Sequence, residues 1–204
     1  MEEEFAVPLC LSSAGNRKVG RVWTFSLPSF VTCPGASAWC RQHCYAWRLE
    51  RLRPNCRRAY VRNLALSLEP ERFVAHVLES LPEDAPLVRV HVGGDFFSPD
   101  YATQWHSICE ARPDTQFWCY TRSWSVTLLR PALEQLRILP NMELLASIDP
   151  EMPLPPEEWR MAFVDIDPRA HGMACRHQQG QVESCLECGY CFQEGAGNVV
   201  FKVH

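Results

Sequence analysis

Three cysteines lie close together near the start of the chain, in a spacing that suits metal binding. Cys33, Cys40 and Cys44 form the pattern Cys-x6-Cys-x3-Cys, and the neighbouring Pro34 and Gly35 are typical of a loop. Thiolates are soft ligands that favour iron–sulfur clusters or zinc. A loop with three thiolates can bind three irons of a [4Fe-4S] cluster and leave the fourth iron open. The alternative is three buried cysteines without metal, because free cysteine behaves as a small hydrophobe.

A second set of four cysteines lies near the end of the chain. Cys175, Cys185, Cys188 and Cys191 form the pattern Cys-x9-Cys-x2-Cys-x2-Cys. Four thiolates can close a tetrahedral zinc site or fully ligate a second cluster. Structural zinc usually takes two well-separated Cys-x2-Cys pairs, so this spacing favours iron–sulfur, with zinc as the alternative. We expect residues 171–197 to form a metal-binding insertion with a structural role.

The remaining sequence favours a reducing compartment for these eleven cysteines. The chain opens with Glu2, Glu3 and Glu4, so it lacks the basic start of a signal peptide, and no apolar run reaches the ~18 residues of a membrane span. We therefore expect a cytoplasmic protein without a membrane partner, in which cysteine clusters indicate metal or catalysis rather than disulfides. The sequence leaves open whether Cys56 closes the first site as a fourth ligand.

The length and the alternation of elements predict one α/β domain over residues 1–204. Six segments have the pattern of strands: residues 22–27, 87–92, 116–121, 142–148, 162–166 and 199–203. Helices are expected at 57–68, 70–81, from Pro99 onward, at 131–139 and, as a short one, at 157–161. We expect a partial (β/α)6 barrel of parallel strands over residues 22–170, closed by a strand at 198–204 after the cysteine-rich insertion.

Polar and glycine residues follow several of these strands, where chemistry gathers in such folds. Gly93, Gly94 and Asp95 follow the second strand, Arg122 the third, and Ser147 and Asp149 lie at the end of the fourth. Asp95 and Arg122 are candidate catalytic residues, because a strand-end arginine can clamp a carboxylate. The candidate cofactor-binding residues are Gly93, Gly94, Asp95, Ser147 and Asp149. The alternative for the glycine pair is a tight turn in which Asp95 binds nearby backbone amides.

The order of a cysteine triad followed by Gly93-Gly94-Asp95 resembles the radical S-adenosylmethionine superfamily. In that superfamily three cysteines hold a [4Fe-4S] cluster, the open iron binds S-adenosylmethionine, and a Gly-Gly-Glu segment receives the cofactor's amino group. The resemblance implies S-adenosylmethionine as a cofactor and an electron donor as a partner. This chain departs from the pattern in its longer loop, in His43 at the aromatic position and in Asp95 for the glutamate.

A closer resemblance covers nearly the whole chain. It rests on several short motifs: Gly15-Asn16-Arg17-Lys18, Trp23-Thr24-Phe25-Ser26-Leu27, Cys33-Pro34-Gly35, Cys44-Tyr45-Ala46, Gly94-Asp95-Phe96-Phe97-Ser98, Tyr120-Thr121-Arg122-Ser123 and Ser147-Ile148-Asp149. These are similar to the phage-associated gene product eighty-eight family. The resemblance names a group and supplies no activity.

Two functional hypotheses follow. The first is an iron–sulfur enzyme like the radical S-adenosylmethionine proteins, acting on a small or anionic substrate, with an open cluster on the first cysteine loop and a fully ligated second centre. The second is a non-catalytic iron–sulfur or zinc module that binds nucleic acid or a protein partner. A run of arginines beside the cysteine loop motivates the second: Arg48, Arg51, Arg53, Arg57, Arg58 and Arg62. A solvated helix face is the alternative for this run, and the net charge of −4 gives no general attraction to nucleic acid.

Overall fold

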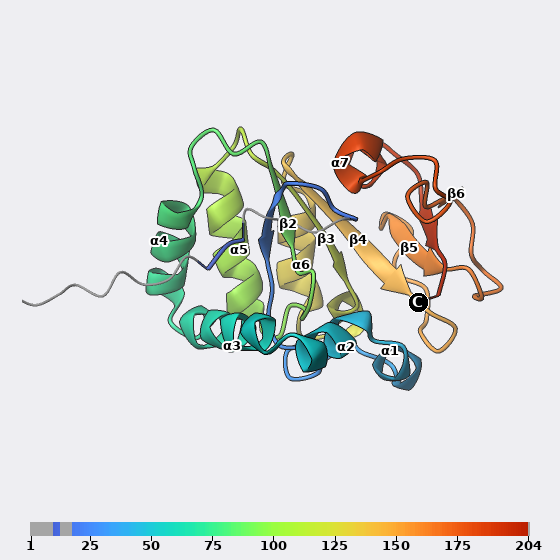
Figure 1. Ribbon diagram of the computed structural model, residues 1–204, viewed down its shortest axis with the longest axis horizontal. Coiled ribbons are helices and arrows are strands. Elements are labelled where there is room, and N and C mark those ends of the chain that lie inside the picture. The colour runs from blue at the N-terminus through green and yellow to red at the C-terminus, as the bar shows by residue number, and fades with distance from the viewer. Residues whose placement is uncertain (1–9, 13–17, 204) are drawn as a thin grey trace, which may run out of the picture.

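The computed structural model describes residues 10–12 and 18–203, and it shows one parallel sheet with helices packed on one face (Figure 1). The sheet has seven strands in the order β1-β2-β3-β4-β5-β7-β6, and every pair of neighbours is parallel. The strands are β1 (Trp23–Phe25), β2 (Leu87–Val90), β3 (Gln116–Thr121), β4 (Met142–Ile148), β5 (Met161–Val164), β6 (Met173–Ala174) and β7 (Val199–Phe201). The motif residues Gly15, Asn16 and Arg17 lie outside the described part of the chain.

Prolines and caps define where the helices begin. Proline occupies one of the first two positions of α3, α4, α5 and α6, where its missing N–H costs no helical hydrogen bond. Ser98 caps α5 by accepting a hydrogen bond from the Tyr101 amide at 3.2 Å. The helices are α1 (Ala38–Gln42), α2 (Tyr45–Leu52), α3 (Pro54–Ser67), α4 (Pro70–Ser80), α5 (Pro99–Ala111), α6 (Arg130–Arg137) and α7 (Cys185–Cys188), with short 3-10 turns η1 (Ser123–Ser125) and η2 (Tyr190–Phe192).

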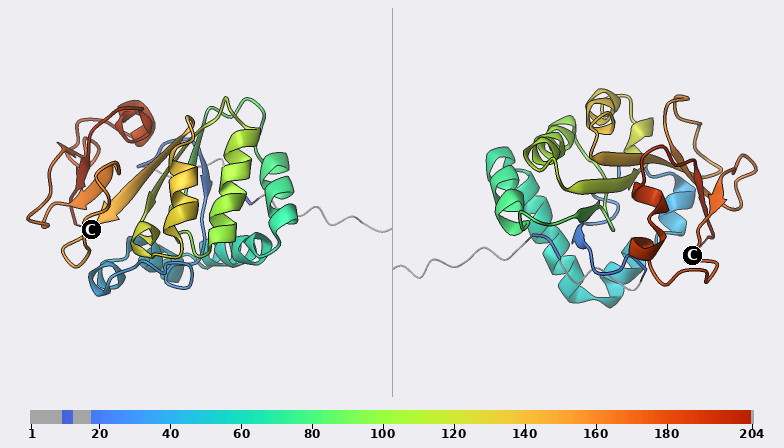
Figure 2. Two further views of the ribbon diagram at one scale, coloured as in Figure 1. Left: turned by 180° about the vertical axis from the view of Figure 1, so that it is seen from behind. Right: turned by 90° about the horizontal axis from the view of Figure 1, so that it is seen from above.

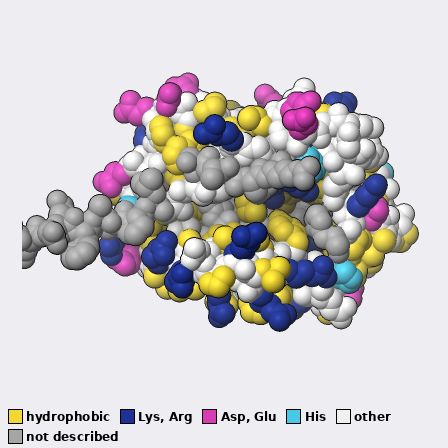
Figure 3. Space-filling model, in the orientation of Figure 1, with side chains coloured by type: hydrophobic (Ala, Val, Ile, Leu, Met, Phe, Trp, Pro, Cys, Tyr) yellow, Lys and Arg dark blue, Asp and Glu magenta, His cyan; other side chains and the backbone are white. Residues whose placement is uncertain are grey.

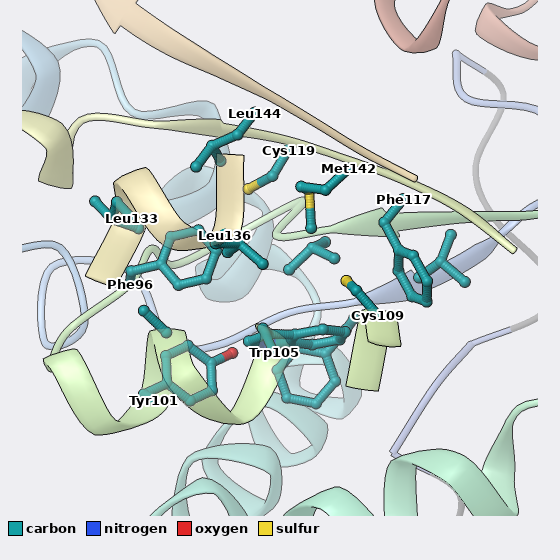
Figure 4. Close-up of a cluster of buried hydrophobic side chains, with 14 of the residues drawn as sticks. Phe96, Tyr101, Trp105, Cys109, Phe117, Cys119, Leu133, Leu136, Met142 and Leu144 are labelled. Carbon is teal, nitrogen blue, oxygen red and sulfur yellow. The ribbon is translucent and has the colours of Figure 1, made fainter. Parts of the chain in front are cut away.

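The main hydrophobic core fills the space between the sheet and helices α4, α5 and α6. Trp105 of α5 lies at its centre, with Phe117 of β3 above it and Tyr101 one helical turn away (Figure 4). Leu133 and Leu136 of α6 pack into the same cluster and are fully buried. Burial of this size dominates the free energy of folding and holds the strand ends in fixed positions.

The cysteine-rich segment covers the opposite face of the sheet. Viewed from above, the strands follow an arc and α7 lies over its open centre (Figure 2). The Cys175 amide donates to Val200 of β7, while the Cys185 amide donates to the Lys18 carbonyl at 2.7 Å, just before β1. The cysteine-rich segment therefore joins β7, near one edge of the sheet, to the residues that precede the opposite edge strand β1.

The structure confirms an α/β fold with parallel strands but not a closed barrel. Within the described residues β1 and β6 are the two edges, because β7 inserts between β5 and β6 and pairs with nothing near β1. The expected last strand is present as β7 and pairs with β5, but the sheet does not close into a barrel. The strand β6 lies in the segment expected to be only an insertion. The third and fourth strands have the expected bounds, and the expected second strand ends early because His91 takes a φ of 61°.

Two further expectations about helices are corrected. Residues 157–161 form turns followed by β5, because Trp159 is buried and its indole N–H donates to Glu134 of α6. The cysteine loop contains α1 and is followed directly by α2, and the short lengths of both helices hide the 3.6-residue periodicity that identifies a helix. In the part of the chain that the structure describes, no helix is both long enough and apolar enough to cross a bilayer.

Candidate functional site

Both cysteine sets line one cavity of about 220 Å³ on the inner face of the sheet. The cysteines that line it are Cys33, Cys40, Cys44, Cys175, Cys185, Cys188 and Cys191. The other predicted site residues in its wall are Gly93, Gly94, Asp95, Arg122 and Ser147. Asp149 lies behind the wall, fully buried and bonded to Arg122. The fold thus gathers in one place two sets that are far apart in sequence and were predicted as separate sites.

All seven of these cysteines are free thiols, and burial disfavours the charged form of four of them. Burial raises the pKa of Cys33 to about 12 and that of Cys191 to about 11, and it also raises the pKa of Cys40 and Cys185. A buried thiol with a raised pKa is a poor nucleophile at neutral pH.

The seven cysteines of the cavity wall are of the chemical type that binds an iron–sulfur cluster. Among residues 10–12 and 18–203, no three His, Cys, Asp or Glu side chains converge as the ligands of a single metal ion do. A [4Fe-4S] cluster does not require ligands that converge on a single metal ion, because each of its cysteines binds a different iron. Cys44 also caps α2, with its sulfur 3.4 Å from the Trp47 amide, a position that favours negative charge. Cys56 lies on α3 and is not part of the cavity wall.

Hydrogen bonds dock the cysteine loop onto the strand ends. Ser37 caps α1 by accepting from the Cys40 amide at 2.9 Å, and its hydroxyl donates to the Asp149 carboxylate at 2.8 Å. The Asp149 carboxylate also pairs with the Arg122 guanidinium. Two residues further along the loop, the Trp39 amide donates to Glu151 at 2.9 Å. Arg122 and Asp149 thus hold the loop in place, and the Arg122 side chain is committed to this pair.

The glycines of the predicted motifs allow backbones to approach closely. A Cβ on Gly35 would lie 2.2 Å from the Arg122 carbonyl oxygen, so this loop packs directly on the turn after β3. Gly94 has a φ of +80°, and a Cβ there would lie 2.5 Å from the Cβ of Leu27. Both glycines therefore have a structural explanation in the packing of the strand ends.

Asp95 is a structural clamp in this arrangement. Its carboxylate accepts hydrogen bonds from the Thr121 hydroxyl at 2.6 Å and from the amides of Phe96, Arg122 and Ser123. Burial raises the pKa of the Asp95 carboxyl, and these hydrogen bonds oppose that rise. Since protein donors saturate both oxygens, Asp95 does not fit the amino-group role that the radical S-adenosylmethionine resemblance implies.

His91 is a core residue rather than a ligand. Its Nε2 lies 2.9 Å from the Tyr101 hydroxyl and its Nδ1 lies 3.6 Å from the Cys119 sulfur. Burial lowers its pKa to about 3, with a further contribution from the charge of Arg89. The imidazole is therefore neutral at physiological pH.

Sequence reasoning missed the charged residue on the cavity wall that most needs an explanation. Arg89 lies in the middle of β2, whose sequence Leu-Val-Arg-Val reads as a buried strand, and only 8% of its surface is exposed. Its guanidinium lies over the rings of Tyr120 and Trp118, at 4.7 and 5.6 Å from the ring centres. A charge inside an apolar strand was the available signal, because charged residues are rarely buried without a partner.

The fold and the cavity define an α/β protein with an open parallel sheet and a cysteine-lined site at the carboxyl ends of its strands. Within this class, the family model described as Gene product 88 matches residues 10–194. The chain therefore belongs to the Gene product 88 family.

Two phage proteins illustrate this relationship. The Gene 88 protein of Mycobacterium phage L5 is 30% identical over 224 residues, covering 94% of this chain and 91% of the phage protein. The Gene 88 protein of Mycobacterium phage D29 is 32% identical over 154 residues, covering 69% of this chain and 62% of the relative. No solved structure is significantly similar to the chain.

Proposed function

We propose that this chain is an iron–sulfur enzyme on a partial (β/α) barrel. The observation that carries the proposal is the convergence of seven free cysteines, from two distant segments, on one cavity at the strand ends. Cys33, Cys40 and Cys44 would hold a [4Fe-4S] cluster, and no fourth cysteine of the cavity lies on their loop. The second set would hold a fully ligated centre, iron–sulfur or zinc, that fastens the C-terminal segment to the sheet.

The proposal extends to S-adenosylmethionine as the ligand of the open cluster. Bound there, it would supply one-electron chemistry that abstracts hydrogen from a small or anionic substrate, with an electron donor as partner. The chain's own contribution is positional: the pair of Arg122 and Asp149 holds the loop, and Gly94 lets β1 and β2 end side by side. Asp95 keeps the turn after β3 in place and is given no part in cofactor binding.

Metal and sulfide analysis of anaerobically purified protein tests the proposal. Replacing the three cysteines of the first set by alanine should leave a folded protein with about half of its metal. The same change in the second set should cost solubility, because metal binding there is also folding energy. Electron paramagnetic resonance of the reduced protein and of both variants assigns each signal to its cysteine set. Zinc without sulfide at both sites would refute the iron–sulfur proposal.

A second assay separates the cluster from its chemistry. Reduction by dithionite in the presence of S-adenosylmethionine should yield 5′-deoxyadenosine in the wild type and none in the first-set variant. An intact cluster that yields no 5′-deoxyadenosine would remove S-adenosylmethionine from the proposal and leave an iron–sulfur protein. Zinc at the second set alone would change only the identity of the structural metal.

The exposed arginine face supports the second candidate function, a module that binds nucleic acid. Six arginines of α2 and α3 and the segment between them are exposed, and the only acidic residue there, Glu50, is buried and bonded to the Ser29 amide. Figure 3 shows Lys and Arg side chains along the lower part of the molecule, where these helices lie. Filter binding across a salt series tests this function, because phosphate contacts make affinity fall steeply with salt. Arg57→Glu with Arg58→Glu should abolish such binding, and salt-insensitive or absent binding would exclude it.

A further inference from the structure

Arg89 is a buried cation that forms no ion pair with any carboxylate of the described residues. None of the described residues accepts a hydrogen bond from its guanidinium, and its Nε is buried without any partner. The surrounding aromatic rings of Trp118 and Tyr120 stabilise a cation only weakly compared with the water it has lost. A protein that keeps such a charge inside an otherwise apolar strand carries an energetic cost that a bound anion would remove.

The cavity around Arg89 is rich in positive charge. Its wall contains five Lys or Arg residues, of which Arg122 is neutralised by its pair with Asp149. The single carboxylate of the wall, that of Asp95, already accepts hydrogen bonds from four protein donors. The basic residues are Lys18, Arg89, Arg122, Arg176 and Lys202. This balance contrasts with the net charge of −4 of the whole chain. A concave site of one sign in an apolar wall concentrates ligands of the opposite sign.

A second nitrogen facing the same cavity also lacks a partner. The Nδ1 of His177 is buried without a hydrogen bond, and His177 lies in the cavity wall with Arg89. Two unsatisfied nitrogens on residues that line one cavity indicate a ligand that satisfies them, because buried polar groups in folded proteins are almost always hydrogen-bonded.

We propose that the cavity binds a small organic anion, whose phosphate or carboxylate group is held by the guanidinium of Arg89. The planar fork of arginine matches the oxygens of either group. The aromatic side chains beside it, Tyr120 and Phe201, provide an apolar surface for the rest of the ligand. This anion site lies in the cavity of the proposed function and specifies the chemistry of its anionic ligand, but it does not depend on a cluster.

Anion titrations of the full-length chain test the site. Inorganic phosphate, phenyl phosphate and benzoate are added at constant ionic strength, and binding is followed by the intrinsic tryptophan fluorescence, to which Trp118 contributes, and by the thermal midpoint. The two organic probes separate phosphate from carboxylate recognition. Wild-type protein should show a saturable response to at least one of them. Arg89→Met should weaken it at least tenfold, about the effect of one lost hydrogen bond to a charged group.

Controls separate anion binding from structure. Arg112→Met removes a partly buried arginine whose side chain is bonded to Leu78 outside the cavity, and this variant should bind anions like the wild type. Without anions, Arg89→Met should be as stable as the wild type or more stable, because no ion pair is lost. Should Arg89→Met fail to fold, Arg89→Lys keeps the charge without the planar fork and should still bind more weakly.

Two outcomes would overturn the site. One is the absence of any saturable response in the wild type, or an equal response in Arg89→Met. The other is loss of bound metal in Arg89→Met with unchanged anion binding, which would make Arg89 a counter-ion of the thiolate centre instead. Failure of the iron–sulfur proposal would show in the metal analysis alone, so the two proposals can fail separately.

Discussion

Replacing Gly35 by alanine should detach the cysteine loop from the strand ends. The Gly35 backbone is unstrained, so the effect comes only from the added methyl group, which would lie 2.2 Å from the carbonyl oxygen of Arg122 and 2.8 Å from the amide nitrogen of Ser123. Those neighbours are backbone atoms and cannot rotate away. Both amides of this turn are bonded to Asp95, at 2.8 and 3.2 Å, so the turn resists movement. The loop itself must therefore shift.

The size of the shift sets the expected energy. Ordinary Cβ contacts begin at about 3.4 Å, so relief requires a displacement of roughly 1 Å. Overpacking of a closely packed contact costs about 1–3 kcal/mol. A 1 Å movement also weakens the nearby bond from Ser37 to Asp149, and a hydrogen bond to a charged group contributes about 1.5–3 kcal/mol. We expect Gly35→Ala to lower the free energy of unfolding by about 2–4 kcal/mol.

Urea unfolding and native-state alkylation measure this effect. Iodoacetamide labelling followed by mass spectrometry should show faster modification of Cys33, Cys40 and Cys44, while labelling of Cys188 stays unchanged. The matched control is Gly197→Ala, whose new methyl group would contact only the Tyr190 hydroxyl at 3.3 Å. If Gly35→Ala matches this control in both measurements, the loop is not held by the packing described here.

Three further predictions concern buried polar groups, and urea unfolding measures each. Asp149→Asn should lower the free energy of unfolding by about 3 kcal/mol, because it leaves Arg122 without its anion. Adding Arg122→Met to this variant should recover part of the lost stability. If it recovers none, the two residues are not coupled. The pKa of His91 is about 3 in the folded protein and 6.5 ordinarily, so the unfolded chain binds more protons between these values and stability falls as pH drops below about 6.5. The full pKa shift corresponds to at most about 5 kcal/mol of unfolding free energy. His91→Asn should therefore flatten the dependence of stability on pH in this range. If the slope is unchanged, other groups cause it. Asn141→Ala should lower the free energy of unfolding by about 2–3 kcal/mol, because the Asn141 side-chain amide donates to three backbone carbonyls from the end of α5 to the start of β3. A loss below about 1 kcal/mol would mean that water replaces the lost hydrogen bonds.

The elements that the sequence predicted well are those whose burial is complete. The strands at 116–121 and 142–148 lie in the middle of the sheet, where apolar runs bounded by turns are unambiguous. The helix starts at Pro70 and Pro99 followed from proline at the first turn. The short strand β6 escaped prediction, because two residues have no detectable periodicity.

The site was predicted in its members but not in their arrangement. Spacing identified the cysteines, yet nothing local indicates that Cys33 and Cys185 face the same cavity, because that follows from the path of the whole sheet. The alternative for Asp95, binding to nearby backbone amides, agrees with its bond from the Phe96 amide, but its partners on β3 and in the turn after it could not be read from the motif. Ser37 has an ordinary sequence context, and only the tertiary contact with Asp149 shows its importance.

The attachment of α7 beside β1 has a consequence for the order in which the protein matures. The amides of Cys185 and Leu186 bind the carbonyls of Lys18 and Val19, so this contact forms only after nearly the whole chain has been synthesised. The edge strand β6 must likewise wait, because its one partner in the sheet is the later strand β7. Contacts between such distant segments are slow to form. During translation the helices and central strands can therefore assemble early, while the cysteine-lined cavity stays open to solutes until the last residues emerge.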